Sequence, residues 1–233
     1  MPGLTPLEIE ALGLSLKVAA ACVIISLPFG LATAWLLARH DFPGKGLFDS
    51  LVHAPLVLPP VAVGYVLLVL LGRRGPIGGW LYDMFGVTLI FTWQGAALAS
   101  AVMAFPLMVR AIRLSLELID RRMETAARTL GAGRLRVAAT ITLPLSLPGI
   151  LTGMMLAFTR SLGEFGATIT FVANIPGETR TLPLALYTLV QSPGGEAGAL
   201  RLMVISLVLA LAALGVSEML ARRMAARLYG GER

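Results

Sequence analysis

Residues 124–144 have the sequence ETAARTLGAGRLRVAATITLP, a polar and arginine-rich insert between two long apolar segments. Within it, Ala126, Ala127 and Leu130 share one face at helical spacing, which predicts a short amphipathic helix. Gly131 is expected to end that helix or to let another backbone approach closely. The insert is therefore predicted to leave the bilayer and to dock a soluble partner. An ordinary solvated loop is the plainer interpretation of its composition.

The composition of the chain indicates a membrane protein. Hydrophobic residues make up 57% of the 233 residues, charged residues only 14%, and the mean hydropathy is +0.82. Soluble domains carry about 25% charged residues, and a helix that crosses the hydrocarbon core needs about 20 mostly apolar residues. We expect an all-α integral membrane protein, a single domain over residues 1–233. The five transmembrane helices are predicted at residues 14–38, 51–71, 89–109, 147–162 and 199–221, with a cytoplasmic segment at 115–144.

The basic residues set the expected topology. Seven arginines fall within residues 110–136, and Arg222, Arg223, Arg227 and Arg233 close the chain. Cytoplasmic loops of membrane proteins are enriched in Lys and Arg, so the 115–144 segment and the C-terminus are predicted to be cytoplasmic and the N-terminus to lie outside. The clusters contain no interleaved aromatic residues that could stack on bases. A nucleic-acid partner is therefore not expected, despite the net charge of +6.

The N-terminus, Cys22 and residues 163–198 allow three further predictions. The N-terminus has no basic region and no cleavage site, so the first apolar stretch is predicted to be a retained span and not a signal peptide. Cys22 is the only cysteine, which excludes a disulfide scaffold and favours a packing role. The apolar pieces within residues 163–198 are too short to span. They should therefore pack against protein, line a water-filled cavity or lie at the outer surface.

The chain has no recognisable catalytic apparatus. It lacks a G-x-x-x-x-G-K-[ST] phosphate-binding loop, so it is not expected to hydrolyse ATP itself. No spacing of His, Cys or carboxylate residues suggests metal ligands, and no serine has plausible triad partners. We expect no catalytic residue, no metal and no cofactor bound by this chain, which would not be an enzyme.

Arg160 and Glu164 are the polar residues that stand out at membrane depth. They lie four residues apart on one predicted helix and can pair or face a cavity. Arg160 could favour an oxyanion in a translocation path while Glu164 shapes a gate. Alternatively, the two form a structural pair at the outer interface. Arg180 could attract anions or a delivery protein, or could be an ordinary solvated charge.

The spacing within the polar insert resembles a known motif. An Ala-Ala-x3-Gly-x9-Ile-x-Leu-Pro pattern matches the EAA motif of membrane subunits of binding-protein-dependent ABC importers. Its members here are Ala126, Ala127, Gly131, Ile141, Leu143 and Pro144. In the strictest form of the motif a Glu directly precedes the Ala pair. Here Thr125 holds that place and Glu124 comes one residue earlier. The resemblance implies a coupling helix that inserts into an ATPase subunit through Glu124, Ala126, Ala127, Leu130 and Gly131.

Other segments resemble oxyanion permeases for molybdate, sulfate and tungstate. Residues 160–167, RSLGEFGA, match that group, and 42–45, 55–60 and 174–181 are most similar to its molybdate branch. The resemblance implies the type I ABC importer permease (MetI-like) fold, a helical bundle that dimerises around the translocation path. It further implies a bacterial inner-membrane location and, as partners, a periplasmic molybdate-binding protein and two ATPase subunits that use ATP and Mg. Import of sulfate or tungstate, or ATP-independent secondary anion transport, remains an alternative.

Overall fold

The computed structural model describes residues 5–229, and the side chains within that range except those of residues 217, 218 and 220–229. Every regular element in this range is helical. The elements are α1 (Pro6–Arg39), α2 (Lys45–Val57), α3 (Pro60–Leu71), α4 (Pro76–Phe85), α5 (Trp93–Glu117), α6 (Arg121–Thr129), α7 (Arg134–Val137), the π-helical turn η1 (Ala138–Thr142), α8 (Leu143–Leu162), α9 (Gly166–Val172), α10 (Leu182–Val190) and α11 (Glu196–Tyr229). Arg233 lies outside the described residues, as do the side chains of Arg222, Arg223 and Arg227.

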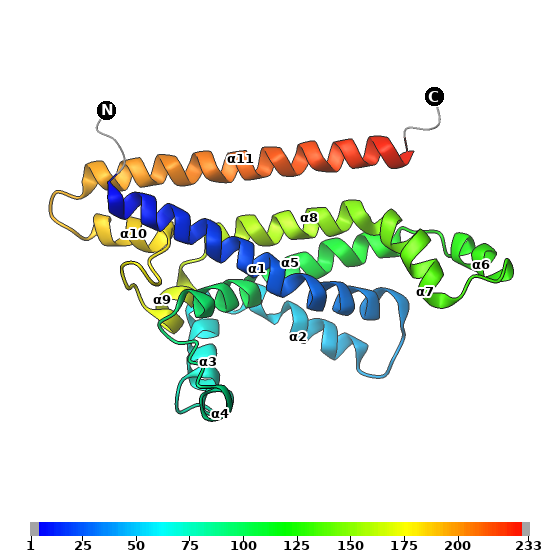
Figure 1. The fold of residues 1–233 in the computed structure, drawn as a ribbon, viewed down its shortest axis with the longest axis horizontal. Helices are drawn as coiled ribbons and strands as arrows, with labels where there is room; N and C mark the ends of the chain where they lie inside the picture. The colour runs from blue at the N-terminus through cyan, green and yellow to red at the C-terminus, as the bar shows by residue number, and fades with distance from the viewer. Residues whose placement is uncertain (1–4, 230–233) are drawn as a thin grey trace.

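Four helical segments are long and apolar enough to cross a membrane. They are Pro6–Arg39, Trp93–Glu117, Arg134–Leu162 and Glu196–Val216. All four run along the long axis of the molecule, with α10 at one end and α6 at the other (Figure 1). They overlap four of the five predicted spans, but α1 begins eight residues before the predicted residue 14, at a Thr5 cap that exchanges hydrogen bonds with Glu8.

The predicted span at residues 51–71 is broken into α2 and α3, which meet at an angle of 113°. The break follows from Pro59 and Pro60, because neither has a backbone N–H for a helical hydrogen bond. The residue before a proline is also driven out of the α region, and Leu58 is extended with φ −70° and ψ 142°. As a result, α3 and α4 project sideways from the bundle (Figure 1).

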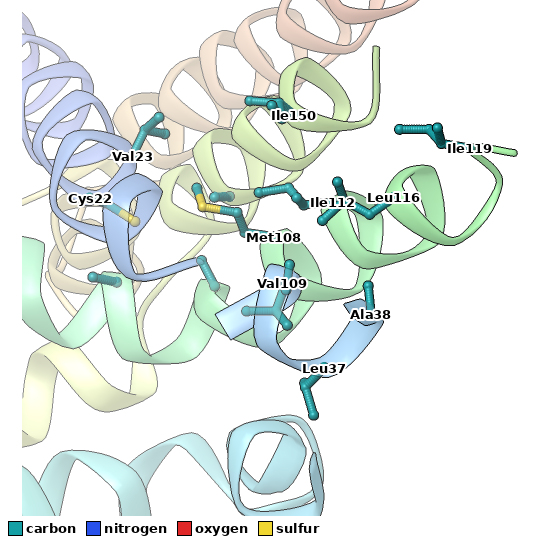
Figure 2. Packing of buried hydrophobic residues seen from close by; sticks show 14 residues of the cluster. Cys22, Val23, Leu37, Ala38, Met108, Val109, Ile112, Leu116, Ile119 and Ile150 are labelled. Carbon is teal, nitrogen blue, oxygen red and sulfur yellow. The ribbon is translucent and has the colours of Figure 1, made fainter. Parts of the chain in front are cut away.

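The core forms where α5 lies between α1 and α8. Ala34 of α1, Ala104 of α5 and Ala157 of α8 are fully buried there. Small residues let helix backbones approach closely, which matters in lipid because burial of apolar side chains adds little there. Met108 and Ile112 fill the space between the helices (Figure 2). Cys22 is buried in the same cluster, in agreement with the packing role predicted for it.

The connection from residue 163 to residue 198 packs against protein. α9 buries Phe171 and Val172 against α3 and α5. α10 buries Leu182 and Ala185 in a small cluster with α1 and α11. The backbone N–H of Leu182 donates a 2.7 Å hydrogen bond to Oγ of Ser15, so the start of α10 is fixed to α1.

Candidate functional site

The polar insert folds into a short helix with defined ends. α6 is capped by Asp120, whose carboxylate accepts the N–H of Arg122 at 2.9 Å. It ends at Thr129, with Leu130 as its C-cap, and Gly131 follows with a φ of +86°, a left-handed conformation that favours glycine. The N–H groups of Gly131 and Ala132 donate to the last turn of the helix at 3.0 Å. The prediction that Gly131 ends this helix is confirmed.

One surface of this segment presents uncovered apolar side chains. Leu130 and Leu135 are each 88% exposed, Leu118 is 78% exposed, and Ala126 is exposed too. Ala127 is half-buried. Exposed apolar side chains on an otherwise polar segment are typical of an interaction surface. We call Ala126 and Leu130, which share one side of α6 at i,i+4 spacing, the docking face.

Glu124 does not belong to the docking face. Its carboxylate Oε1 lies 2.9 Å from Nη2 of Arg39, at the end of α1, and accepts a 2.8 Å hydrogen bond from the hydroxyl of Thr142 in η1. Both charged side chains are largely buried, with exposed fractions of 9% for Arg39 and 13% for Glu124. Glu124 therefore ties α6 to the end of α1 and to η1. The sequence alone gave no sign of this contact, because Arg39 lies 85 positions away.

Arg160 and Glu164 form an ion pair at the far end of α8. Nη1 of Arg160 lies 2.6 Å from Oε2 of Glu164, whose side chain is only 1% exposed. The other carboxylate oxygen accepts the N–H of Ala167 at 2.8 Å, which satisfies a donor in the first turn of α9. The pairing of these two residues, one of the two options left by the sequence, is present. Glu164 therefore joins the end of α8 to the start of α9.

α9 in turn packs tightly on α3. A Cβ atom added to Gly64 would lie 2.6 Å from the carbonyl oxygen of Ala167 and 2.9 Å from its Cα. Only glycine permits this approach of the two backbones. Arg180, the third predicted polar candidate, donates from Nε to Oδ1 of Asn174 at 2.8 Å in the connection that follows α9. Within the described residues, no hydrogen bond or ion pair joins it to Arg160 or Glu164.

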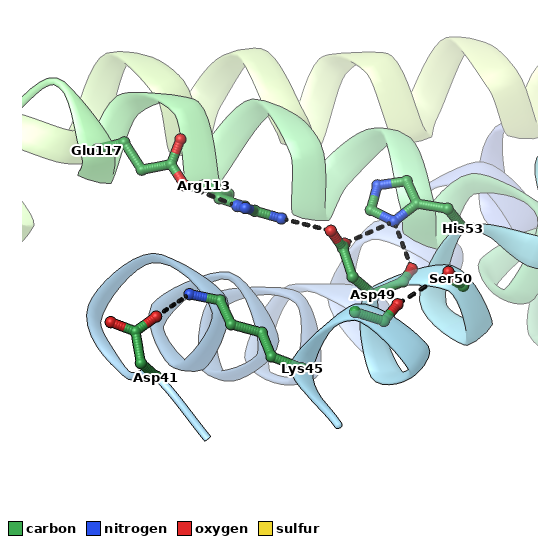
Figure 3. Close-up of polar contacts among 8 residues, drawn as sticks. Asp41, Lys45, Asp49, Ser50, His53, Arg113 and Glu117 are labelled. Carbon is green, nitrogen blue, oxygen red and sulfur yellow. Dashed lines mark hydrogen bonds and ion pairs between the residues drawn. The ribbon is translucent and has the colours of Figure 1, made fainter. Parts of the chain in front are cut away.

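A second polar cluster was not predicted from the sequence. Arg113 of α5 donates from Nη1 to Asp49 of α2 and from Nε to Glu117, both at 2.8 Å (Figure 3). Nδ1 of His53 lies 3.1 Å from the same Asp49 carboxylate. The i,i+4 spacing of Asp49 with His53, and of Arg113 with Glu117, was the available signal. The cluster fastens the first half of the broken helix to α5.

The charged groups near this cluster contain no metal site. Among the described residues, no group of three or more His, Cys, Asp or Glu side chains could hold a metal ion. Lys45, the first residue of α2, donates to Asp41 in the preceding loop at 2.9 Å and lowers the pKa of that exposed carboxyl. This ion pair lies at the surface and contributes little to stability.

Comparison with known proteins identifies the class. Residues 26–226 match the family model for the inner membrane component of binding-protein-dependent transport systems, and the chain belongs to this family. Solved ABC importers share the fold. An amino acid transporter chain has a TM-score of 0.64 at 21% identity, covering 94% of both chains. An importer of the polysaccharide alginate has a TM-score of 0.72 at 17% identity, covering 94% of this chain and 80% of that one.

Individual relatives in this family include permeases named for molybdenum and for sulfate transport. The chain is 67% identical over 219 residues to the molybdenum transport system permease protein ModB of Escherichia coli K12, covering 94% of this chain and 96% of that protein. It is 57% identical over 225 residues to ModB of Haemophilus influenzae, covering 97% and 98%. The sulfate transport system permease protein CysT of Escherichia coli K12 is 36% identical over 207 residues, covering 88% and 74%.

Proposed function

We propose that this chain is the membrane permease subunit of an ABC importer that moves molybdate into the cell. The observation that carries the proposal is the 67% identity to a molybdenum permease over 94% of the chain. Likeness to a sulfate permease is weaker, at 36%, and covers less of both proteins. Sulfate and tungstate are tetrahedral dianions like molybdate and remain the second candidates.

The chain would sit in a bacterial inner membrane with five spans, counting the bent α2–α3 pair as one. Its N-terminus would be periplasmic and its C-terminus cytoplasmic. This orientation is supported by Arg39 and the arginines of α6 and α7, which gather at one end of the bundle, since basic residues favour the cytoplasmic side. The functional unit would be a homodimer with a periplasmic molybdate-binding protein and two ATPase subunits. ATP and Mg would be used by the ATPase, and the permease would bind no cofactor.

The exposed docking face supports the proposal that the ATPase binds at α6. Ala126 and Leu130 are exposed, small or apolar, and held at the tip of a capped helix. The proposed coupling residues therefore divide into two groups. Ala126, Ala127, Leu130 and Gly131 would meet the ATPase, while Glu124 would transmit the movement of α6 to Arg39 in α1 and Thr142 in η1.

A mechanical route leads from this end to the proposed gate. Residues Arg134–Leu162 form one continuous helical segment, so displacement at η1 reaches Arg160. The ion pair between Arg160 and Glu164 would pass this displacement to α9, which packs on α3 at Gly64. The ATP and ADP states of the ATPase would favour different positions of α6 and thereby switch the path between two states.

Reconstitution tests the proposal. Proteoliposomes that contain the chain, its ATPase and the binding protein should accumulate molybdate only with ATP, and tungstate and sulfate should be tested as competitors. Faster accumulation of sulfate than of molybdate would assign the chain to sulfate transport. Accumulation by the chain alone, without ATP, would identify a secondary transporter.

A further inference from the structure

A cavity of about 700 Å³ lies between α6, α7 and the end of α1, and neither Ala126 nor Leu130 lines it. Arg39, Arg121, Arg128 and Arg134 line it together with a single acidic residue, Glu124. His40 also lines it. With His40 neutral, four guanidinium groups against one carboxylate leave a formal excess of three positive charges.

The positive charge is not neutralised within the described part of the chain. Glu124 pairs with Arg39, and Arg121 donates to the carbonyl of Ala38 at 3.3 Å. Arg128 and Arg134 form no ion pair with any described acidic side chain. Like charges held around one cavity repel one another, and an anion bound between them would remove that repulsion.

The side chain of Arg39 is a second, independent reason to expect an anion in this cavity. Its side chain is 9% exposed. Nε and Nη2 are buried and make no aligned hydrogen bond with any described residue, although Nη2 approaches Glu124 as an ion-pair partner. A buried guanidinium donor without an acceptor is costly. The planar guanidinium matches the oxygen geometry of tetrahedral anions and can donate two parallel hydrogen bonds to them.

We propose that this cavity binds a free tetrahedral oxyanion, of the same class as the transported one, from the side of the membrane where the ATPase docks. The bound anion would link Arg128 in α6 and Arg134 in α7 to Arg39 in α1. It would thereby restrain α6, the element that must move during transport, so accumulated anion would slow further import. The regulatory role rests on the proposed function, whereas the binding site rests on the cavity alone.

Hydrogen–deuterium exchange of the complete transporter in phosphatidylcholine nanodiscs tests the binding. Molybdate, without ATP or binding protein, should slow exchange in residues 121–142. In the double variant Arg128→Gln/Arg134→Gln, the half-saturating concentration should rise at least about tenfold, since charge-assisted hydrogen bonds are lost. The matched control Arg122→Gln/Arg136→Gln removes the same charge from α6 and α7 at positions that do not line the cavity. Its half-saturating concentration should stay at the native value.

A lipid phosphate offers the same tetrahedral oxygens, so a second arm replaces part of the lipid with phosphatidylglycerol. Protection by that lipid, with none from molybdate, would overturn the proposal in favour of a headgroup site. Equal loss of protection in both double variants would also overturn it, because a general charge effect would explain the result. Uptake measurements separate the two proposals. A native transporter that imports molybdate but shows no protection disproves only the cavity site, and one that imports none disproves the proposed function.

Discussion

The carboxylate of Glu124 lies 2.9 Å from the guanidinium of Arg39, although 85 positions separate the two residues in the chain. The same carboxylate accepts the hydroxyl of Thr142. This three-way contact joins α6 to both α1 and η1 through a single side chain.

Glu124→Gln should uncouple transport from ATP hydrolysis. The amide keeps an acceptor for Thr142 but leaves Arg39 without a charged partner, at a cost of about 3 kcal/mol, the low end for buried pairs because both side chains keep some exposure. The docking face is unchanged, so the ATPase should still co-purify. The ratio of ATP hydrolysed to molybdate imported should rise. In Arg39→Gln/Glu124→Gln neither charge remains, and coupling should recover in part. A native ratio in the single variant would contradict the role of the pair.

Leu130→Asp should abolish binding of the ATPase without disturbing the fold. The side chain is 88% exposed, so a charge there costs little in the isolated permease, but it would be desolvated in an apolar interface. Co-purification of the ATPase from detergent is the measurement. Leu130→Met keeps the apolar surface and should retain the ATPase. Equal retention by both variants would place the ATPase elsewhere.

Gly131→Asp should lose uptake while the permease still inserts. No atom lies within 4 Å of a Cβ at this position, so the substitution creates no clash inside the chain. The φ of +86° strains any side chain by about 1–2 kcal/mol, with Asn and Asp tolerated best. Comparison with Gly131→Asn separates strain from charge. Uptake by the Asn variant should exceed uptake by the Asp variant, and equal values would show that backbone strain alone is responsible.

Substitutions of Glu164 should lower thermal stability in a fixed order. Glu164→Gln loses the charge that pairs with Arg160 but keeps an acceptor for the N–H of Ala167. Glu164→Ala loses both, so its stability should be lower by about a further 1 kcal/mol, the usual value of a helix cap. Thermal unfolding in detergent gives the order. If the two variants unfold together, the contact with α9 contributes nothing.

Gly64→Ala should destabilise the permease and reduce uptake. The new methyl group would overlap the backbone of Ala167, and overpacking of this kind costs about 1–3 kcal/mol. Gly13→Ala, in α1, is a matched control because nothing lies within 4 Å of its Cβ. The control should unfold at or slightly above the native temperature. A native unfolding temperature for Gly64→Ala would show that α3 can move away from α9 without cost.

The regular features of the fold could be predicted from the sequence because they depend on local composition. Uncharged stretches indicated the long helices, and the glycine at position 131 indicated where the short helix of the polar insert ends. The 113° break after Leu58 was not predicted, because the apolar stretch continues through it without a charged residue. Hydropathy reports the length of an apolar segment but not its direction.

The candidate site was predictable only where its contacts are local. Arg160 and Glu164 are one helical turn apart, so their pairing followed from spacing. The contacts of Glu124 with Arg39, and of Gly64 with Ala167, join residues far apart in the chain. No periodicity within a single segment contains that information. The three-dimensional structure was therefore needed to show that the docking face is exposed while Glu124 points inward to Arg39 and Thr142.

The long-range partner of Glu124 also determines how permeases of this kind could be recombined. A graft of residues 121–137 would transfer the docking face of one transporter to another as a continuous piece of chain. It would carry Glu124 but neither Arg39 nor Thr142, which come from the recipient. A chimera would therefore acquire the ATPase preference of the donor, yet drive transport only where the recipient already supplies both partners of that carboxylate.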